Sequence, residues 1–291
     1  MTLPLVVGVD GSDACLRAVD WAVDEAARHG LPLRLVYACV WEHYEGTVPA
    51  TGVERSSEQV LAERIVASAA DRAERRNPDV KATTDILPED AADALVRAGE
   101  GAFALVTGSR ERGRVKGLLL GSVGLAVASR AHCPVVVVRG DHAGVSGTHG
   151  RILLGPEEAD TGAEAARFAF READARDCAL DVVRTGHHSA HQTGGGRPRA
   201  EEPADARAPA SLEDSIDSMI ARYPRVRTHR SVHEGPAGRI LVHLSAAADL
   251  VVVGVRRGTG RLGPRIGKAV PALLHHAQCP VAVVPSGRER L

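Results

Sequence analysis

Short runs of consecutive apolar residues alternate with amphipathic stretches along the whole chain. The run Val135 to Val138 is apolar at every position, which is typical of a strand that helices cover on both faces. In the first half the pattern predicts strands at 3–9, 32–39, 80–87, 103–108 and 134–138. Between these strands it predicts helices at 12–29, 57–76, 88–99 and 121–131. This regular alternation predicts an α/β fold with a doubly wound parallel sheet.

The second half of the chain repeats the first. The run Ala131-His132-Cys133-Pro134 returns as Ala277-Gln278-Cys279-Pro280, 146 positions later, and Val6-Val7-Gly8 matches Leu153-Leu154-Gly155 at an offset of 147. The apolar pattern of this half predicts strands at 151–155, 179–184, 225–232, 249–255 and 280–284. Its helices are expected at 160–176, 211–222, 236–246 and 267–277. The sequence therefore predicts two copies of one five-stranded domain.

The predicted domains are residues 1–140 and 151–291, and the glycine-rich segment 141–150 is predicted to link them. A polar insertion at 185–210 is expected to form a loop, as is segment 41–56 in the first half. The insertion contains His187, His188 and His191, but no acidic or cysteine partner at a regular spacing, so we predict no metal site there.

Composition excludes several classes of function. The chain of 291 residues has 36 basic and 37 acidic residues and a net charge of -1, whereas a dedicated nucleic-acid binder normally has a basic excess. No apolar stretch is long enough to cross a membrane, and the N-terminus has no secretion signal. The five cysteines form no C-x-x-C pair. We expect reduced thiols in a cytoplasmic protein, with neither nucleic acid nor membrane as a partner.

The candidate chemistry lies where strands end. Gly8-Val9-Asp10 follows the first strand, Ala38 lies near the end of the second, and Gly108 ends the fourth. A loop rich in glycine and arginine then leads to Gly121-Ser122-Val123, which is expected to open a helix. A helix N-terminus favours phosphate, and Asp10 can accept hydrogen bonds from ribose hydroxyls or from an adenine amino group. Ligands of such sheets bind beyond these strand ends.

At these residues both halves resemble the universal stress protein family. The resemblance rests on the start Val7-Gly8-Val9-Asp10-Gly11-Ser12, on the spacing of Gly108 from Gly121-Ser122, and on the end Cys133-Pro134-Val135-Val136-Val137-Val138, and it covers essentially the entire chain. It implies a fold like that of the adenine nucleotide alpha hydrolases, and ATP or AMP as ligand, with Mg²⁺ as an optional companion. The nucleotide-binding residues that it implies are Gly8, Val9, Asp10, Ala38, Thr107, Gly108, Arg110, Gly121, Ser122 and Val123.

Two departures from the family pattern bear on binding. Glu111 occupies the position of the motif's second glycine, so it places a negative charge beside the expected phosphates. The second half departs further, and we expect its site to be degenerate. The residues of this second site are Glu157, Gly254, Arg257, Gly267 and Lys268.

No catalytic residue is predicted. The run Gly258 to Gly263 satisfies G-x-G-x-x-G, but it follows the fourth strand of its unit, and Gly263 to Ala269 lacks the spacing and the hydroxyl of a P-loop. We find no nucleophile elbow, no H-E-x-x-H and no carboxylate pair fixed by spacing. The protein is therefore expected not to be an enzyme, with slow ATP hydrolysis left open.

The leading hypothesis is a tandem universal stress protein that binds an adenine nucleotide in its first half and acts as a stress-response sensor or regulator. The alternative is a nucleotide-free scaffold that recruits a protein partner, whose identity the sequence does not give. In dimers of this family the last strands pair across the two-fold axis. We therefore predict that Val135–Val138 and Val281–Val284 pair within one chain as a pseudo-dimer, with further homo-oligomers left open.

Overall fold

The computed structural model of the chain describes residues 2–40, 57–109, 122–155, 159–186, 212–256, 267 and 269–286. In the first half the strands are β1 (Leu5–Gly8), β2 (Leu33–Ala38), β3 (Ala82–Leu87), β4 (Ala104–Gly108) and β5 (Val135–Val138). The helices of this half are α1 (Asp13–His29), α2 (Ser57–Arg76), α3 (Ala91–Ala98) and α4 (Ser122–Arg130). The predicted elements of this half are thus present in the predicted order.

The second half has the same succession of elements. Its strands are β6 (Arg151–Gly155), β7 (Ala179–Gly186), β8 (Thr228–Glu234), β9 (Leu250–Val255) and β10 (Val281–Pro285). Its helices are α6 (Ala159–Arg176), α7 (Leu212–Arg222), α8 (Ala237–Leu244) and α9 (Ala269–His276). The predicted duplication is confirmed at the level of secondary structure.

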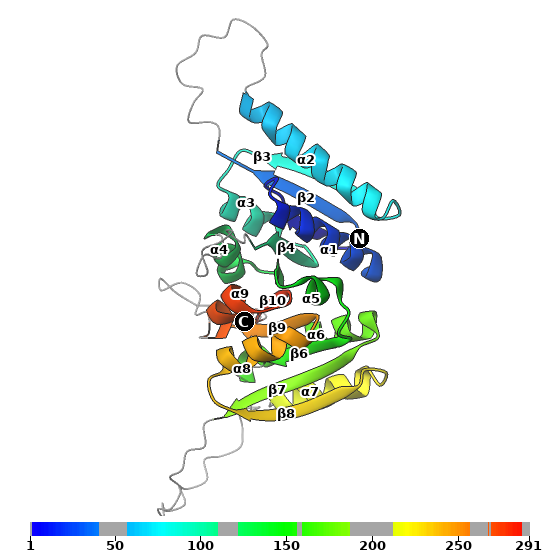
Figure 1. Ribbon diagram of the computed structural model, residues 1–291, viewed down its shortest axis with the longest axis vertical. Helices are drawn as coiled ribbons and strands as arrows, with labels where there is room; N and C mark the ends of the chain where they lie inside the picture. The colour runs from blue at the N-terminus through cyan, green and yellow to red at the C-terminus, as the bar shows by residue number, and fades with distance from the viewer. Residues whose placement is uncertain are drawn as a thin grey trace, which may run out of the picture.

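The ten strands of the described residues form one continuous sheet in the order β3-β2-β1-β4-β5-β10-β9-β6-β7-β8. Pairing is parallel within each half, and the two halves join where β5 runs antiparallel to β10, with Val136 opposite Ala282. The predicted pairing of the two last strands within one chain is therefore confirmed. Figure 1 shows the result as an elongated molecule, with α2 and β3 at one end and α7 and β8 at the other.

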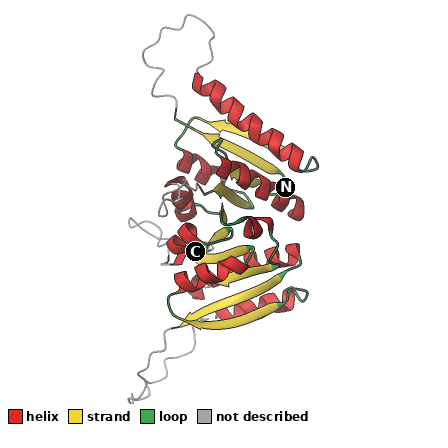
Figure 2. Cartoon of the chain, in the orientation of Figure 1, coloured by secondary structure: helices red, strands yellow, loops and turns green. Residues whose placement is uncertain are grey.

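Helices cover both faces of the sheet (Figure 2). On one face α1 packs against α2 and α6 against α7, and α1 also contacts α6 of the other half. On the opposite face α3 packs against α4 and α8 against α9. Alternate residues of β5 and β10 point into the two layers, so each of the two apolar cores is continuous across both halves.

Several boundaries differ from the sequence prediction, and in three elements a local interaction explains the difference. Helix α3 begins at Ala91 rather than at residue 88, because the Asp90 carboxylate accepts hydrogen bonds from the backbone N–H groups of Ala92 and Asp93 and caps the helix. Strand β7 continues to Gly186, two residues into the predicted loop, because it pairs with β8 over that length. Strand β8 covers 228–234 rather than 225–232, because a turn closed by Val226 N–H and Tyr223 C=O precedes it.

The segment between the halves is also more ordered than predicted. Residues 141–150 contain a short helix, α5 (His142–Ser146), whose first turn is capped by Asp141. A Cβ atom on Gly144 would lie only 2.6 Å from the carbonyl oxygen of Gln278, so a side chain there would collide with the second half. The predicted linker therefore packs tightly against the domain that follows it.

Candidate functional site

A cavity of about 350 Å³ lies at the carboxyl ends of the first-half strands. The strand order reverses between β1 and β4, because the chain leaves β1 toward β2 on one side and returns to β4 on the other. At such a point the loops diverge and leave a crevice in which ligands of open α/β sheets bind. The cavity lies within the range of about 300–1,000 Å³ that is usual for small-molecule sites.

Most of the predicted nucleotide-binding residues line this one cavity. The lining residues predicted from the sequence are Gly8, Val9, Asp10, Ala38, Thr107, Gly108 and Val123. Ser122 is the first residue of α4, directly before Val123, as expected. Arg110 and Gly121, together with Glu111, lie outside the described residues.

Asp10 lies at the mouth of the cavity in a tight turn before α1. Its Oδ1 atom accepts hydrogen bonds from the backbone N–H of Ser12, at 3.0 Å, and from the Ser12 hydroxyl, at 2.6 Å. The Ser12 Oγ atom in turn accepts from the backbone N–H of Cys15 and caps α1. Gly11 permits the turn with a positive φ of 75°. The carboxylate is thereby held in place while its side chain remains exposed.

Two of the predicted glycines serve packing at this site. A Cβ atom on Gly108 would lie 2.4 Å from the carbonyl oxygen of Ala14, so α1 can cross the end of β4 only over a glycine. A Cβ atom on Gly8 would lie 2.8 Å from a methyl carbon of Leu95 on α3. These glycines bring the backbones of α1 and α3 close to the strand ends and so shape the walls of the cavity.

The cavity wall also carries polar side chains. Thr107 is buried, and its hydroxyl oxygen has no hydrogen-bond partner among the described residues. Tyr37 lines the wall near the end of β2, and burial, together with the neighbouring Cys39 and Asp10, raises the pKa of its phenol. The site therefore combines an apolar wall with a carboxylate, an unpaired hydroxyl and a phenol.

The motif did not predict several of the lining residues. The additional wall is formed by Ser12, Cys15, Val36, Tyr37, Ala91, Leu95 and Gly124. Ala91 and Leu95 lie four positions apart on α3, on one face of that helix, which a helical-periodicity argument can identify once α3 is placed over the strand ends. Tyr37 and Gly124 directly flank the predicted residues Ala38 and Val123.

Two residues of the predicted second site lie in the described part of the chain. Gly254 lies in β9 and Gly267 shortly before α9. The other predicted residues of the degenerate site, Glu157, Arg257 and Lys268, lie outside the described residues, as do His187, His188 and His191. The comparison between the two halves therefore rests on the sequence at these positions.

Comparisons with known proteins agree with this architecture. A model of the universal stress protein family matches residues 1–139 and again 148–285. A universal stress protein of Mycobacterium tuberculosis is 30% identical over 282 residues, which covers 96% of this chain and 95% of that protein. The crystal structure of a universal stress protein from Archaeoglobus fulgidus superposes with a TM-score of 0.71 at 15% identity, covering 98% of both chains.

The solved structures also include a universal stress protein in complex with cAMP. It is 30% identical to this chain, and the match covers 47% of this chain and 98% of that protein at a TM-score of 0.37.

In the part of the chain that the structure describes, no helix combines the length and the apolar character needed to cross a membrane.

Proposed function

Because this chain belongs to the universal stress protein family, we propose that its first half binds an adenine nucleotide, ATP or AMP, and that the protein acts as a sensor or regulator in a stress response. The observation that carries the proposal is the cavity between β1 and β4, where Asp10 and the start of α4 line the same space. A carboxylate and a helix N-terminus in one crevice suit the two chemically different ends of a nucleotide.

Each end of the cavity suits one part of the ligand. The exposed carboxylate of Asp10 accepts hydrogen bonds from ribose hydroxyls, and the apolar wall around Val36 and Leu95 packs against the base. Val123 and Gly124 belong to the first turn of α4, whose backbone N–H groups and positive dipole end attract phosphate. The Thr107 hydroxyl is a further hydrogen-bonding group in the wall.

The lining residues support binding more than catalysis. Among the described residues of the cavity wall, Asp10 is the one carboxylate, and no histidine lines the wall to act as a general base. A slow hydrolysis that uses bound Mg²⁺ remains compatible with this proposal. We place the protein in the cytoplasm under the same proposal, which is supported by its five free cysteines, all of them thiols in the structure.

Calorimetric titration tests the proposal. Wild-type protein is titrated with ATP and with AMP, each with and without Mg²⁺, beside the variants Asp10→Ala and Glu111→Gly. We expect Asp10→Ala to weaken binding by roughly 10- to 100-fold, because a hydrogen bond to a charged group contributes about 1.5–3 kcal/mol. The matched control Glu157→Ala changes the corresponding position of the second half and is expected to leave binding unchanged.

Two results would redirect the proposal. If wild type gives no heat but Glu111→Gly binds nucleotide, the scaffold alternative replaces nucleotide binding. If Asp10→Ala binds as tightly as wild type, the ligand occupies another part of the molecule.

A further inference from the structure

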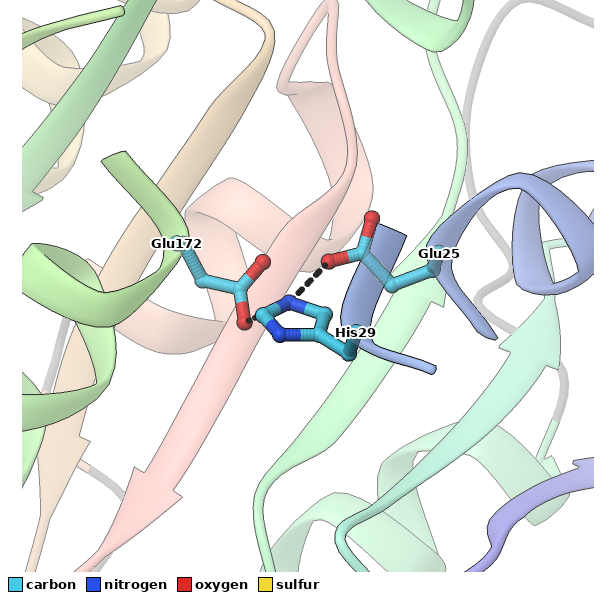
Figure 3. A group of neighbouring side chains, drawn as sticks. All are labelled: Glu25, His29 and Glu172. Atoms are coloured by element: carbon cyan, nitrogen blue, oxygen red, sulfur yellow. Dashed lines mark hydrogen bonds and ion pairs between the residues drawn. The ribbon is translucent and has the colours of Figure 1, made fainter. Parts of the chain in front are cut away.

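A buried polar cluster lies between the two halves of the chain, away from the cavity. Glu25 and His29 belong to the last turns of α1, and Glu172 to the last turns of α6 (Figure 3). Arg176 ends α6 one turn after Glu172. The side chains of Glu25 and Glu172 are only 2% and 1% exposed. The cluster therefore unites residues of both domains inside the protein.

Three ligand atoms converge at its centre. The Nε2 atom of His29 lies 3.1 Å from Oε1 of Glu25 and 3.2 Å from Oε1 of Glu172, and the potential ligand atoms of the three residues all lie within 4.8 Å of one another. Ligands bound about 2.1 Å from one metal ion at tetrahedral or octahedral angles are separated by roughly 3.0–3.4 Å. The two separations that involve His29 therefore match those of ligands around one ion.

The outer oxygens of both carboxylates face guanidinium groups. Arg176 Nη2 lies 2.5 Å from Oε2 of Glu25, and its Nε lies 3.6 Å from Oε2 of Glu172. Arg28 Nη1 contacts the same Oε2 atom of Glu25 at 2.5 Å. Metal-binding carboxylates are commonly oriented in this way by partners on the oxygen that faces away from the ion. The arrangement leaves the two inner Oε1 atoms directed toward His29.

A single proton on His29 does not satisfy both inner oxygens. The Nε2 atom lies in hydrogen-bonding geometry with Glu25. Both carboxylate oxygens of Glu172 are buried and make no hydrogen bond with any described residue, although Oε1 lies in ion-pair range of His29. A buried carboxylate without hydrogen bonds is costly, and a cation shared by all three ligands removes that cost.

The side-chain charges of the cluster are balanced, and two helix ends add negative charge to it. The guanidinium groups of Arg28 and Arg176 balance the carboxylates of Glu25 and Glu172, and a histidine that binds a metal is neutral. Both helices also end at the cluster, α1 at His29 and α6 at Arg176, so the negative ends of two helix dipoles meet there. Each such end is equivalent to about half an elementary negative charge.

We propose that Glu25, His29 and Glu172 bind one divalent transition-metal ion at the junction of the two halves. One imidazole and two carboxylates form a ligand set suited to Zn²⁺, Mn²⁺ or Fe²⁺, and water completes the coordination. Because the ligands come from α1 and α6, the bound ion joins the two domains.

Equilibrium dialysis with Zn²⁺ tests the proposal after the protein has been treated with a chelator. Wild type is compared with His29→Gln, with Glu172→Gln and with the control His149→Gln. His149 also pairs with a buried carboxylate, that of Asp249, but it lies outside the cluster. The sequence segment with His187, His188 and His191 is the same in all four proteins, so any zinc that it binds cancels in the comparison.

We expect wild type and His149→Gln to hold one zinc ion per chain more than the two cluster variants, or to bind it at least 10-fold more tightly. Zn²⁺ should also raise the melting temperature of wild type and of His149→Gln, but not that of the two cluster variants. Equal zinc stoichiometry and affinity in all four proteins would overturn the proposal. A second test uses wild type alone, so it does not depend on whether the variants fold. Co²⁺ should give visible absorption bands that one equivalent of Zn²⁺ abolishes. The absence of these bands would also overturn the proposal.

Discussion

The continuous sheet predicts that the two halves unfold together. The sharpest perturbation is Ile216→Ala in α7, at the end of the second half that lies far from the junction in Figure 1. Ile216 is fully buried and belongs to an apolar core that extends through β10 and β5 into the first half. A defect at this position therefore reaches the first half only through cooperative packing.

The expected magnitude follows from burial. Truncation of a buried Ile to Ala costs about 2–5 kcal/mol, because transfer free energy is lost and a cavity remains. A loss of about 3 kcal/mol lowers the melting temperature of a large cooperative unit by about 2 °C per kcal/mol, or about 6 °C in total. If the second half unfolded alone, its smaller unfolding entropy would give a larger shift, of about 12 °C.

Two spectroscopic probes distinguish these cases. Both tryptophans, Trp21 and Trp41, belong to the first half. The buried Trp21 has the guanidinium of Arg176 from α6 at 5.6 Å from its ring centre, so tryptophan fluorescence reports on the first half and on its junction with α6. Far-ultraviolet circular dichroism reports on both halves. In Ile216→Ala the two probes should shift together and by the same amount, although the substitution lies in the half without tryptophan.

A fluorescence transition at the wild-type temperature, accompanied by a biphasic dichroism curve, would refute this reasoning. The control Ser218→Ala, at an exposed position of the same helix, should change stability by no more than about 0.5 kcal/mol.

Two further predictions concern the junction between the halves. Burial lowers the pKa of His29, but the neighbouring carboxylates of Glu172 and Glu25 outweigh burial and raise the pKa to about 9, while burial raises the pKa of Glu172 to about 7. Both folded-state values exceed the unfolded ones, so metal-free protein should lose stability as pH rises, through Glu172 between pH 4.5 and 7 and through His29 between pH 6.5 and 9. The His29 part should be roughly 2 kcal/mol, and chelator-treated His29→Gln should show a flatter profile in denaturant titrations above pH 6.5. The buried Asp249 carboxylate accepts hydrogen bonds from the backbone N–H groups of residues 149, 150 and 151. Asp249→Ala should therefore lower the free energy of unfolding in urea by about 3 kcal/mol, and Asp249→Asn should lower it clearly less. Equal losses in the two variants would argue against this hydrogen-bonding role.

Much of the architecture was predictable because it rests on local patterns that repeat. The uninterrupted valines of β5 marked a strand covered on both faces, and the matching run 146 positions later located β10. The start of α3 was not predictable from periodicity, because the side chain of Asp90 decides it through two hydrogen bonds. Helix α5 was missed for a similar reason, since its order comes from packing against the second half.

The candidate cavity was predicted in part from motifs, whereas the junction cluster was not predicted at all. The motif located Asp10, just after β1, and Thr107 and Gly108, the last residues of β4, but the wall from α3 depends on how that helix lies over the sheet. Glu25 and His29 belong to no motif, and their partners are distant in sequence. Their spacing of four positions, repeated by Glu172 and Arg176, was the one available indication.

That repetition has a consequence for symmetry. Glu172 and Arg176 each lie 147 positions after Glu25 and His29, so the pseudo-two-fold axis relates the two pairs. In a homodimer, every residue beside the axis faces its own copy, and each substitution changes both copies at once. In a single chain the two positions can differ. Both halves have glutamate at the first position, Glu25 and Glu172, but the second position is His29 in one half and Arg176 in the other. A symmetric dimer of residues 1–140 would have two histidines and no Arg176 at this junction. The single chain can therefore form a junction cluster that such a dimer cannot form.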